Sequence, residues 1–341
     1  MSLAVGVDIG GTKVLGGVVA EDGTVVARAR RPTPSHDVAD TATAIAAVVA
    51  ELRERHGVDA IGIGAAGWID LNRATVLFAP NLAWRDEPLR DRLQQLIGLP
   101  VVVENDANAA AWAEYRFGSA RGEPVVLMIT LGTGIGSGLV VGGEVYRGAY
   151  GVAPEFGHMT VVAGGRRCGC GNRGCWEQYA SGKALVREAR DIASGAPLAA
   201  ERLMQLAGGT VAAIQGELVT KAALEGDAAA GECFDEVGKW LGMGLADLAA
   251  ALDPSCFVIG GGVAEAGHLL LAPTTAAFAA NLTGRGHRPA ASVRLAALGN
   301  AAGLIGAADL ARTAGTADTA DTGSTGGTGS TGDTARSAGP R

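Results

Sequence analysis

Short apolar runs alternate with amphipathic segments over the first part of the chain. Apolar runs at 5–9 and 14–19 flank a Gly-Gly-Thr turn and predict a β-hairpin. Beyond it, helical spacing of apolar residues alternates with runs that have the length of buried strands. After a Pro-containing loop we expect a helix at 39–55, a strand at 60–64, a helix at 86–98, a strand at 101–104 and a helix ending at 117. This order predicts a layered α/β domain.

The second half of the chain repeats this plan. A strand expected at 125–130 is followed by a Gly-Thr turn and a second strand at 139–141, as in the first hairpin. One glycine-rich hairpin is a weak signal, whereas two suggest duplicated halves that hold a single phosphate chain from both sides. A helix with one buried face is expected at 234–252, and a strand at 256–259.

The C-terminal segment differs from the rest in composition. From residue 313 the chain consists mainly of Thr, Gly, Ala, Asp and Ser in a near-repeat. Such a segment buries too little apolar surface to offset its loss of conformational entropy. We therefore expect 313–341 to be a disordered tail without catalytic content.

Composition narrows the class of protein. A chain of 341 residues is long enough for two domains with separate cores. Its net charge of −7 argues against a nucleic-acid-binding surface, and no apolar run has the length needed to cross a bilayer. No secretory signal is recognisable, so we expect a protein of the reducing cytoplasm. Cys233 and Cys256 lie in apolar stretches and are expected in the core.

The segment between Glu155 and Glu177 has the highest density of potential metal ligands in the chain. This span contains one imidazole and three thiols, at His158, Cys168, Cys170 and Cys175. Three thiolates and an imidazole are a standard ligand set for tetrahedral zinc, and four protein ligands with no open position make the site structural. The alternative is a run of buried cysteines near an unrelated histidine. A disulfide across the single residue between the first two cysteines is disfavoured by geometry. A zinc ion here would position the two flanking carboxylates.

The first hairpin turn exposes backbone N–H groups and the hydroxyl of Thr12, which suits a phosphate chain. Asp8, at the end of the preceding strand, is placed to hold a hydrated Mg²⁺ ion. The alternative is an ordinary tight turn. The segment is not a P-loop, because the spacing Gly-x₄-Gly-Lys-Ser/Thr is absent.

Two further strand ends carry candidate functional residues. Asp106 follows the strand at 101–104, and ligands bind at the carboxyl ends of strands in open α/β sheets. Local pattern leaves two roles open for Asp106, a helix N-cap or a general base. Three glycines at 260–262 follow the strand at 256–259 and allow a flat ring to lie against the backbone, as an adenine site requires.

Together these motifs resemble the ROK (repressor, open reading frame, kinase) family of sugar kinases over roughly residues 3–312, and most closely its bacterial ATP-dependent glucokinases. The pattern Cys-x-Cys-Gly-x₂-Gly-Cys-x-Glu at 168–177 is highly specific to that family. The resemblance implies the α/β actin-like ATPase (ribonuclease H-like) fold, with two domains and a cleft between them. The small N-terminal domain would comprise 1–117, rejoined by a C-terminal helix at 299–312, and the large domain 118–298.

The resemblance also implies roles for single residues. Asp106 matches the catalytic base. The sugar-binding positions are Gly67, Asn105, Asp106, Glu155, His158 and Glu177. The nucleotide-binding positions are Asp8, Gly10, Gly11, Thr12 and Lys13 in the first phosphate loop, Gly132, Thr133, Gly134 and Gly136 in the second, and Gly260, Gly261, Gly262 and Val263 in the adenosine loop. The metal positions are His158, Cys168, Cys170 and Cys175 for zinc and Asp8 for magnesium.

The activity implied by the resemblance is transfer of the γ-phosphate of ATP to the 6-hydroxyl of glucose, with Mg²⁺ and structural Zn²⁺ as cofactors. A cytoplasmic homodimer or homotetramer that binds neither nucleic acid nor membrane is expected. Mannose, fructose or N-acetylmannosamine as acceptor, and polyphosphate as donor, are alternatives. The family's sugar-responsive repressors carry a helix-turn-helix ahead of the first phosphate loop, which here starts within ten residues of Met1. A transcriptional regulator is therefore the least favoured interpretation.

Overall fold

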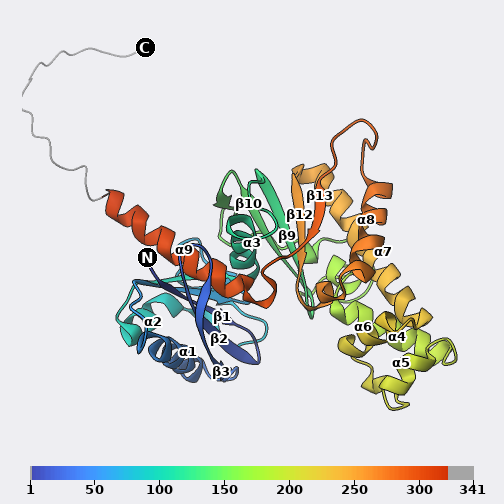
Figure 1. Ribbon diagram of the computed structural model, residues 1–341, viewed down its shortest axis with the longest axis horizontal. Coiled ribbons are helices and arrows are strands. Elements are labelled where there is room, and N and C mark those ends of the chain that lie inside the picture. The colour runs from blue at the N-terminus through green and yellow to red at the C-terminus, as the bar shows by residue number, and fades with distance from the viewer. Residues whose placement is uncertain (1, 322–341) are drawn as a thin grey trace, which may run out of the picture.

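The computed structural model describes residues 2–321 and is built on two five-stranded sheets (Figure 1). Each sheet starts with an antiparallel hairpin and adds two parallel strands beside the hairpin's first strand. The first sheet has the order β3-β2-β1-β4-β8, with β1 at Ala4–Ile9, β2 at Lys13–Val19, β3 at Val25–Pro32, β4 at Ala60–Ala65 and β8 at Val101–Asn105. The second has the order β11-β10-β9-β12-β13, with β9 at Val125–Leu131, β10 at Ile135–Val141, β11 at Glu144–Val145, β12 at Cys256–Gly260 and β13 at Ser292–Leu295. The two sheets thus confirm the predicted duplication of the strand, turn and strand plan.

Strand β3 differs from the sequence prediction, which placed a Pro-containing loop after the first hairpin. It lies at the edge of the first sheet and pairs with β2. Its arginines at 28, 30 and 31 are exposed, as charged side chains on edge strands commonly are. Because these charged residues interrupt the apolar residues, the hydrophobic pattern did not predict this strand.

The N-terminal lobe consists of the first sheet and the elements packed on it. Helices α1 (Val38–Arg53) and α2 (Leu89–Ile97) share one core cluster with this sheet, which confirms both predicted helices. α2 ends at Gly98, whose φ of 74° is the left-handed conformation typical of a helix C-terminus. A small antiparallel sheet completes the lobe, with β5 at Trp68–Ile69, β6 at Val76–Phe78 and β7 at Arg85–Glu87.

Helices α3 (Asp106–Arg116) and α9 (Ala302–Asp321) lie between the two sheets (Figure 1). Their alanines form one core cluster with strands of both sheets. A Cβ atom at Gly62 would lie 1.8 Å from the carbonyl oxygen of Ala307, so only glycine permits this approach of α9 to β4. Because α3 and α9 share one core cluster with strands of both sheets, the domain boundaries near residues 117 and 299 stay a prediction.

The C-terminal end of α9 also departs from expectation. The helix continues to Asp321, whereas the sequence predicted its end at residue 312 and a disordered tail from 313. The first part of that predicted tail is therefore helical. The remainder, 322–341, lies outside the described residues.

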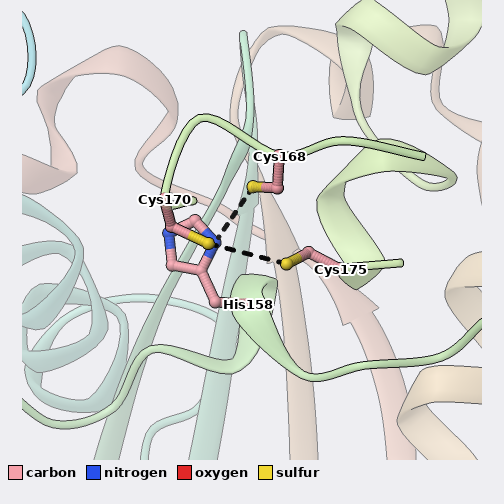
Figure 2. Close-up of side chains that lie close together, drawn as sticks. All are labelled: His158, Cys168, Cys170 and Cys175. Atoms are coloured by element: carbon pink, nitrogen blue, oxygen red, sulfur yellow. Dashed lines mark hydrogen bonds between the residues drawn. The ribbon is translucent and has the colours of Figure 1, made fainter. Parts of the chain in front are cut away.

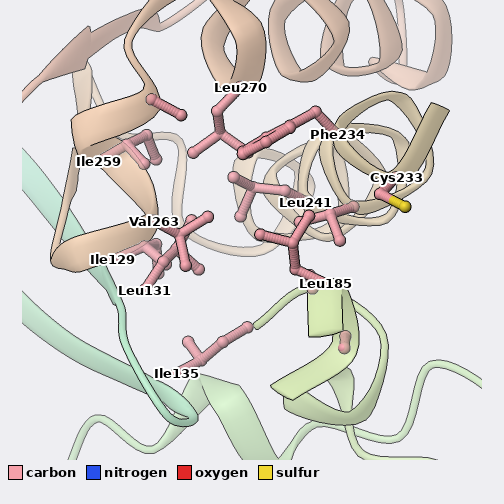
Figure 3. Packing of buried hydrophobic residues seen from close by; sticks show 14 of the residues in the cluster. Ile129, Leu131, Ile135, Leu185, Cys233, Phe234, Leu241, Ile259, Val263 and Leu270 are labelled. Atoms are coloured by element: carbon pink, nitrogen blue, oxygen red, sulfur yellow. The ribbon is translucent and has the colours of Figure 1, made fainter. Parts of the chain in front are cut away.

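The C-terminal lobe consists of the second sheet and five helices. These are α4 (Gly182–Gly195), α5 (Glu201–Leu206), α6 (Gly216–Leu224), α7 (Ala228–Leu252) and α8 (His268–Asn281). Figure 3 shows their largest core, in which Ile129 and Ile259 of the sheet face Leu241 of α7 and Leu270 of α8. Leu185 anchors α4 to the same core.

Five short 3₁₀ turns connect these elements within the described part of the chain. They lie at Phe156–His158, Trp176–Gln178, Val211–Ala213, Gly262–Ala266 and Gly299–Ala301. Among residues 2–321, no helix is both long enough and apolar enough to span a membrane.

Candidate functional site

Two cavities adjoin each other, the smaller between the lobes and the larger mainly within the C-terminal lobe. The smaller, of about 530 Å³, is lined from the N-terminal lobe by the segment around Gly67 and from the C-terminal lobe by the segment around Glu155. The larger, of about 1260 Å³, is lined by α4, α6 and the glycine-rich turns of the second sheet. Gly132, Thr133 and Lys183 line both cavities. A ligand in one cavity therefore meets a ligand in the other at the turn between β9 and β10.

Asp106 lies where β8 ends and α3 begins, and it lines the smaller cavity. The N-cap of α3 is Asn105, whose Oδ1 accepts a hydrogen bond of 3.0 Å from the N–H of Asn108. Asp106 itself accepts from the N–H of Ala107, at 2.9 Å. Burial raises the pKa of Asp106 above its usual value. The N-cap role therefore belongs to its neighbour, and the carboxylate of Asp106 is left to line the smaller cavity.

A hydrogen-bonded chain joins the wall of the smaller cavity to Asn105. The Nδ2 group of Asn105 donates to the carbonyl oxygen of Gly67 at 3.0 Å. A Cβ atom at Gly67 would lie 2.4 Å from the carbonyl oxygen of Phe78, so glycine is required there. The adjacent Trp68 donates from Nε1 to Oε1 of Glu155 at 3.0 Å, across the cleft. The tryptophan thereby orients a carboxylate of the opposite lobe.

Asp8 is the penultimate residue of β1. Burial and the negative charge of Asp106 together raise its pKa to about 7, although the cation of Lys13 opposes both effects. Two carboxylates that raise one another's cost of ionisation would be relieved by a divalent cation. The oxygen donors of Asp8 thus suit the magnesium ion expected from the sequence.

The four predicted zinc ligands converge (Figure 2). Their ligand atoms all lie within 4.8 Å of one another, with 3.6 Å between the sulfurs of Cys170 and Cys175 and 3.6 Å between Nδ1 of His158 and the sulfur of Cys168. Zinc–sulfur bonds of about 2.3 Å in a tetrahedron place sulfurs roughly 3.8 Å apart, so this donor set fits the ion. All five cysteines of the chain are free thiols, which excludes the disulfide alternative.

The cluster also borders one wall of the smaller cavity. Nε2 of His158 points away from the thiols and lies 4.0 Å from Oε2 of Glu155. After Cys175 the chain is held by Trp176, which is fully buried and donates from Nε1 to the carbonyl oxygen of Trp240 in α7 at 2.8 Å. The next residue, Glu177, accepts from the Cys168 thiol at 3.0 Å. One loop thus delivers both a histidine nitrogen and a carboxylate to the smaller cavity.

Glu177 also reaches the second phosphate loop. A Cβ atom at Gly134 would lie 2.3 Å from its Oε2, so the loop runs directly against this carboxylate. Gly134 and Gly136 line the smaller cavity, as Gly132 and Thr133 line both. The structure therefore brings the predicted second phosphate loop to the junction of the cavities.

The remaining predicted nucleotide residues divide into two groups. Gly262 and Val263 line the larger cavity, and the preceding Gly261, with φ of 84°, would clash through a Cβ atom with the backbone of Leu131. By contrast, Gly10, Gly11, Thr12 and Lys13 line neither cavity. Gly11 instead lies against Asn81, a residue of the smaller cavity's wall. The first phosphate loop is therefore at the rim of the site.

Several lining residues were not predicted, notably Trp68, Asn81, Lys183 and two arginines of α4, Arg187 and Arg190. One local signal was available: Ser181 is an N-cap, its Oγ accepting from the N–H of Ala184, and it marks the start of α4. No local pattern distinguishes Trp68 or Asn81, because their place in the wall depends on the opposite lobe.

Comparison with known proteins identifies the architecture. The chain is 50% identical over 312 residues to a glucokinase of Streptomyces coelicolor, covering 92% of this chain and 98% of that protein. Its structure resembles a crystal structure of a ROK family glucokinase from Streptomyces griseus in complex with glucose and AMPPNP, with a TM-score of 0.85, 53% identity, and coverage of 92% and 100% of the two chains. A ROK hexokinase from Thermus thermophilus matches with a TM-score of 0.74 and 35% identity, covering 92% of this chain and 99% of that one.

The fold is thus the two-domain actin-like ATPase fold expected from the sequence. The model of the ROK family matches residues 4–314, which include both sheets, both cavities and the cysteine cluster. The chain belongs to the ROK family.

Proposed function

We propose that this protein is a glucokinase, which transfers the γ-phosphate of ATP to the 6-hydroxyl of glucose and releases glucose 6-phosphate and ADP. The observation that carries this proposal is the carboxylate of Asp106 in a small polar cavity that meets a larger cavity at a glycine-rich turn. The similarity to glucokinases over nearly the whole chain supports the same activity.

Asp106 is the proposed general base. The 6-hydroxyl must lose a proton as its oxygen attacks the γ-phosphorus, and a carboxylate within hydrogen-bond reach can accept that proton. Burial raises the pKa of Asp106 and makes it a stronger base than an exposed aspartate. Phosphoryl transfer otherwise requires positioning and neutralisation of charge.

The polar wall of the smaller cavity is the proposed glucose site. Asn105, Glu155, His158 and Glu177 offer directional partners for hydroxyl groups, and all of them line this cavity. An epimer with one hydroxyl reversed would leave one of these groups buried and unpaired. The epimer would therefore lose much more binding free energy than a change in apolar contact would cost, and the site would select against it. This arrangement supports glucose over mannose or N-acetylmannosamine.

The larger cavity is the proposed nucleotide site. Its turns at Thr133 and Gly262 expose backbone N–H groups to the phosphates and the adenosine. Magnesium held near Asp8 would neutralise phosphate charge when bound. The first phosphate loop, now at the rim, would approach the phosphates when the lobes close around both substrates.

The cysteine cluster is the proposed site of a structural zinc ion. Its ligands His158, Cys168, Cys170 and Cys175 leave no open position, so the ion would hold the loop that carries Glu155 and Glu177. The thiols must stay reduced to bind it, which fits the cytoplasm as the place of action. A homodimer or homotetramer remains part of this proposal.

The decisive experiment compares ATP-dependent phosphorylation of glucose, mannose, fructose, galactose, N-acetylglucosamine and N-acetylmannosamine by the wild type and by Asp106→Asn. We expect a strong preference for glucose. In the variant, kcat should fall by about 10²–10⁴, because positioned general bases contribute that much, while glucose binding measured by calorimetry persists. Asp247→Asn, at an exposed position of α7, is the matched control.

The pH profile provides a second readout of the same residue. The base must be ionised, and its pKa is raised, so kcat/KM should fall as the pH drops through an apparent pKa above 3.8, the usual value for aspartate. Asp106→Asn should lose this acidic limb. Turnover of no sugar, with glucose binding intact, would instead identify a sugar sensor, and turnover with polyphosphate but not ATP would change the donor.

A further inference from the structure

The first turn of α4 is wedged between the two nucleotide loops. The N–H of Gly182 donates to the carbonyl oxygen of Gly132 at 2.9 Å. A Cβ atom at Gly182 would lie 2.6 Å from that oxygen and 3.3 Å from Cγ2 of Val263. Any larger residue would separate the second phosphate loop from the adenosine loop. The next residue, Lys183, is consequently held at the junction of the cavities.

Lys183 is the only lysine or arginine that lines the smaller cavity, among the residues that the structure describes. The carboxyl groups in the same lining belong to Asp106, Glu155 and Glu177. A phosphoryl group that enters this space would face three negative charges. A single cation at the junction offsets them where the two substrates meet.

The cation of Lys183 has no structural role within the described part of the chain. Its side chain is exposed and has no ion pair or hydrogen bond within residues 2–321. A positive charge in the first turn of a helix also opposes the helix dipole, so it does not stabilise α4. An anionic ligand at the junction would supply the missing partner.

The other lysines and arginines that line the cavities are Arg187, Arg190 and Lys221, and Lys221 lines only the larger one. Nη2 of Arg187 donates to the carbonyl oxygen of Gln178. Nη2 of Arg190 donates to the carbonyl oxygens of Ala212 and Ile214, and both of these bonds are 2.8 Å long. Both arginines line only the larger cavity. Lys13 lies in the first phosphate loop, outside both linings.

We propose that Lys183 is a further catalytic residue, which donates hydrogen bonds to the phosphoryl group during transfer. This proposal rests on the proposed kinase activity. In that step the sugar O6 forms a bond to the γ-phosphorus and the bond from phosphorus to the β,γ-bridging oxygen breaks. ADP leaves with the electron pair, and the hydroxyl proton goes to Asp106. The ammonium group of Lys183 balances charge on the equatorial oxygens, which is greatest in the transition state.

Kinetics of Lys183→Met provide the first test, because methionine keeps length and helix propensity but removes the charge. We expect kcat to fall by about 10²–10³, the cost of removing one oriented charge-stabilising donor, with the KM for glucose nearly unchanged. Affinity should fall more for a nonhydrolysable ATP analogue than for ADP. Lys183→Arg should restore part of kcat. Lys239→Met, on the exposed face of α7, is the charge-matched control. A wild-type kcat in Lys183→Met overturns the proposal.

Chemical protection provides a readout that does not depend on turnover. The chain has only four lysines, at 13, 183, 221 and 239, so acetylation of each can be followed by mass spectrometry. A nonhydrolysable ATP analogue with glucose should protect Lys183, AMP with glucose should not, and Lys239 should react equally in all samples. Equal acetylation of Lys183 in every sample overturns the proposal. If the wild type phosphorylates no sugar, the kinase assignment fails separately, and protection by the ATP analogue still reports whether Lys183 meets a phosphate.

Discussion

The two ends of the cleft are built in different ways. The sugar end depends on contacts between the lobes: Trp68 with Glu155 at 3.0 Å, Arg147 with Glu104 at 3.7 Å, and the backbone of Gly151 against Ile69 and Asp70. The nucleotide end is lined by the C-terminal lobe and by one residue from outside it, Asn300. A change in the pairing of the lobes should therefore alter sugar affinity more than nucleotide affinity.

The ion-pair network at the sugar end shows how closely the lobes are tied. The Glu104 side chain is 1% exposed and lies 3.0 Å from Nε of Arg73 in its own lobe and 3.7 Å from Nε of Arg147 in the other. Its Oε1 also accepts from the N–H of Asn105 at 3.0 Å. Burial lowers the pKa of Arg147, and the charge of Glu104 opposes this effect. One buried carboxylate thus joins the end of β8, next to Asp106, to the segment that leads to Glu155.

Loss of the metal should have the largest effect on glucose affinity. In Cys175→Ser we expect loss of stoichiometric zinc by elemental analysis, because a hydroxyl is a poor substitute for a thiolate ligand. The loop carrying Glu155 and Glu177 would lose its order, and the dissociation constant for glucose should rise by at least about tenfold, or ~1.4 kcal/mol. ADP binding should stay within about twofold.

A matched control for this variant is Cys233→Ala, a buried cysteine of α7 outside the cluster. It should keep both zinc and glucose affinity. Pure, active wild-type protein without stoichiometric zinc would contradict the metal assignment. An equal loss of ADP affinity in Cys175→Ser would contradict the independence of the two ends.

Removal of the ion pair between the lobes should have a smaller effect of the same kind. Arg147→Met leaves Glu104 with Arg73 as its remaining cation, so we expect a loss in the free energy of unfolding of about 2 kcal/mol, below the 3–5 typical of a fully orphaned buried charge. The KM for glucose should rise by a few-fold while the KM for ATP is unchanged. Denaturant unfolding and steady-state kinetics measure the two effects.

The control for that variant is Arg31→Met. Its pair with Glu51 is exposed on both sides, and exposed pairs contribute at most about 1 kcal/mol. If Arg147→Met destabilises the protein no more than Arg31→Met does, the buried network does not tie the lobes together.

The smallest predicted effect concerns one hydrogen bond. Trp68→Phe keeps the ring packed against Phe78, at 5.5 Å between centroids, but removes the N–H that orients Glu155. Because Trp68 is 41% exposed, water can replace the lost donor, so the effect should lie at the low end of the ~0.5–1.5 kcal/mol that a net hydrogen bond contributes, and the KM for glucose should rise about twofold. Trp240→Phe, which removes an N–H bonded to Glu236 away from the cleft, is the control. An altered KM for ATP in Trp68→Phe would show that the two ends are coupled.

Much of the fold was predictable because it rests on local periodicity. The hairpins at β1–β2 and β9–β10 combine apolar runs with glycine turns, and the helices α1 and α2 repeat apolar residues at helical spacing. The sequence analysis did not predict edge strand β3, because its exposed arginines interrupt the apolar pattern. The extension of α9 to Asp321 was not predicted either, because the composition from residue 313 favoured a disordered segment over a helix.

The candidate site also contains residues that local sequence predicts and residues whose place depends on the fold. Close spacing in the sequence was enough to predict the convergence of His158 and the three cysteines, because a short glycine-containing loop must bring its own ligands together. Local pattern left Asp106 open as a helix N-cap, and the structure assigns that cap to Asn105 instead. That choice depends on backbone dihedral angles at the end of β8, which local composition does not determine.

The sequence by itself determined the two hairpins with glycine-rich turns, the cluster of one histidine and three cysteines, and the family, since each depends on residues close together in the chain. Only the tertiary structure decided that Trp68 meets Glu155, that Arg147 meets Glu104, and that Lys183 stands where the two cavities join. Those contacts connect segments separated by tens of residues, and their geometry depends on how α3, α9 and both sheets pack. Apolar periodicity records which face of an element is buried, but not which distant element covers it.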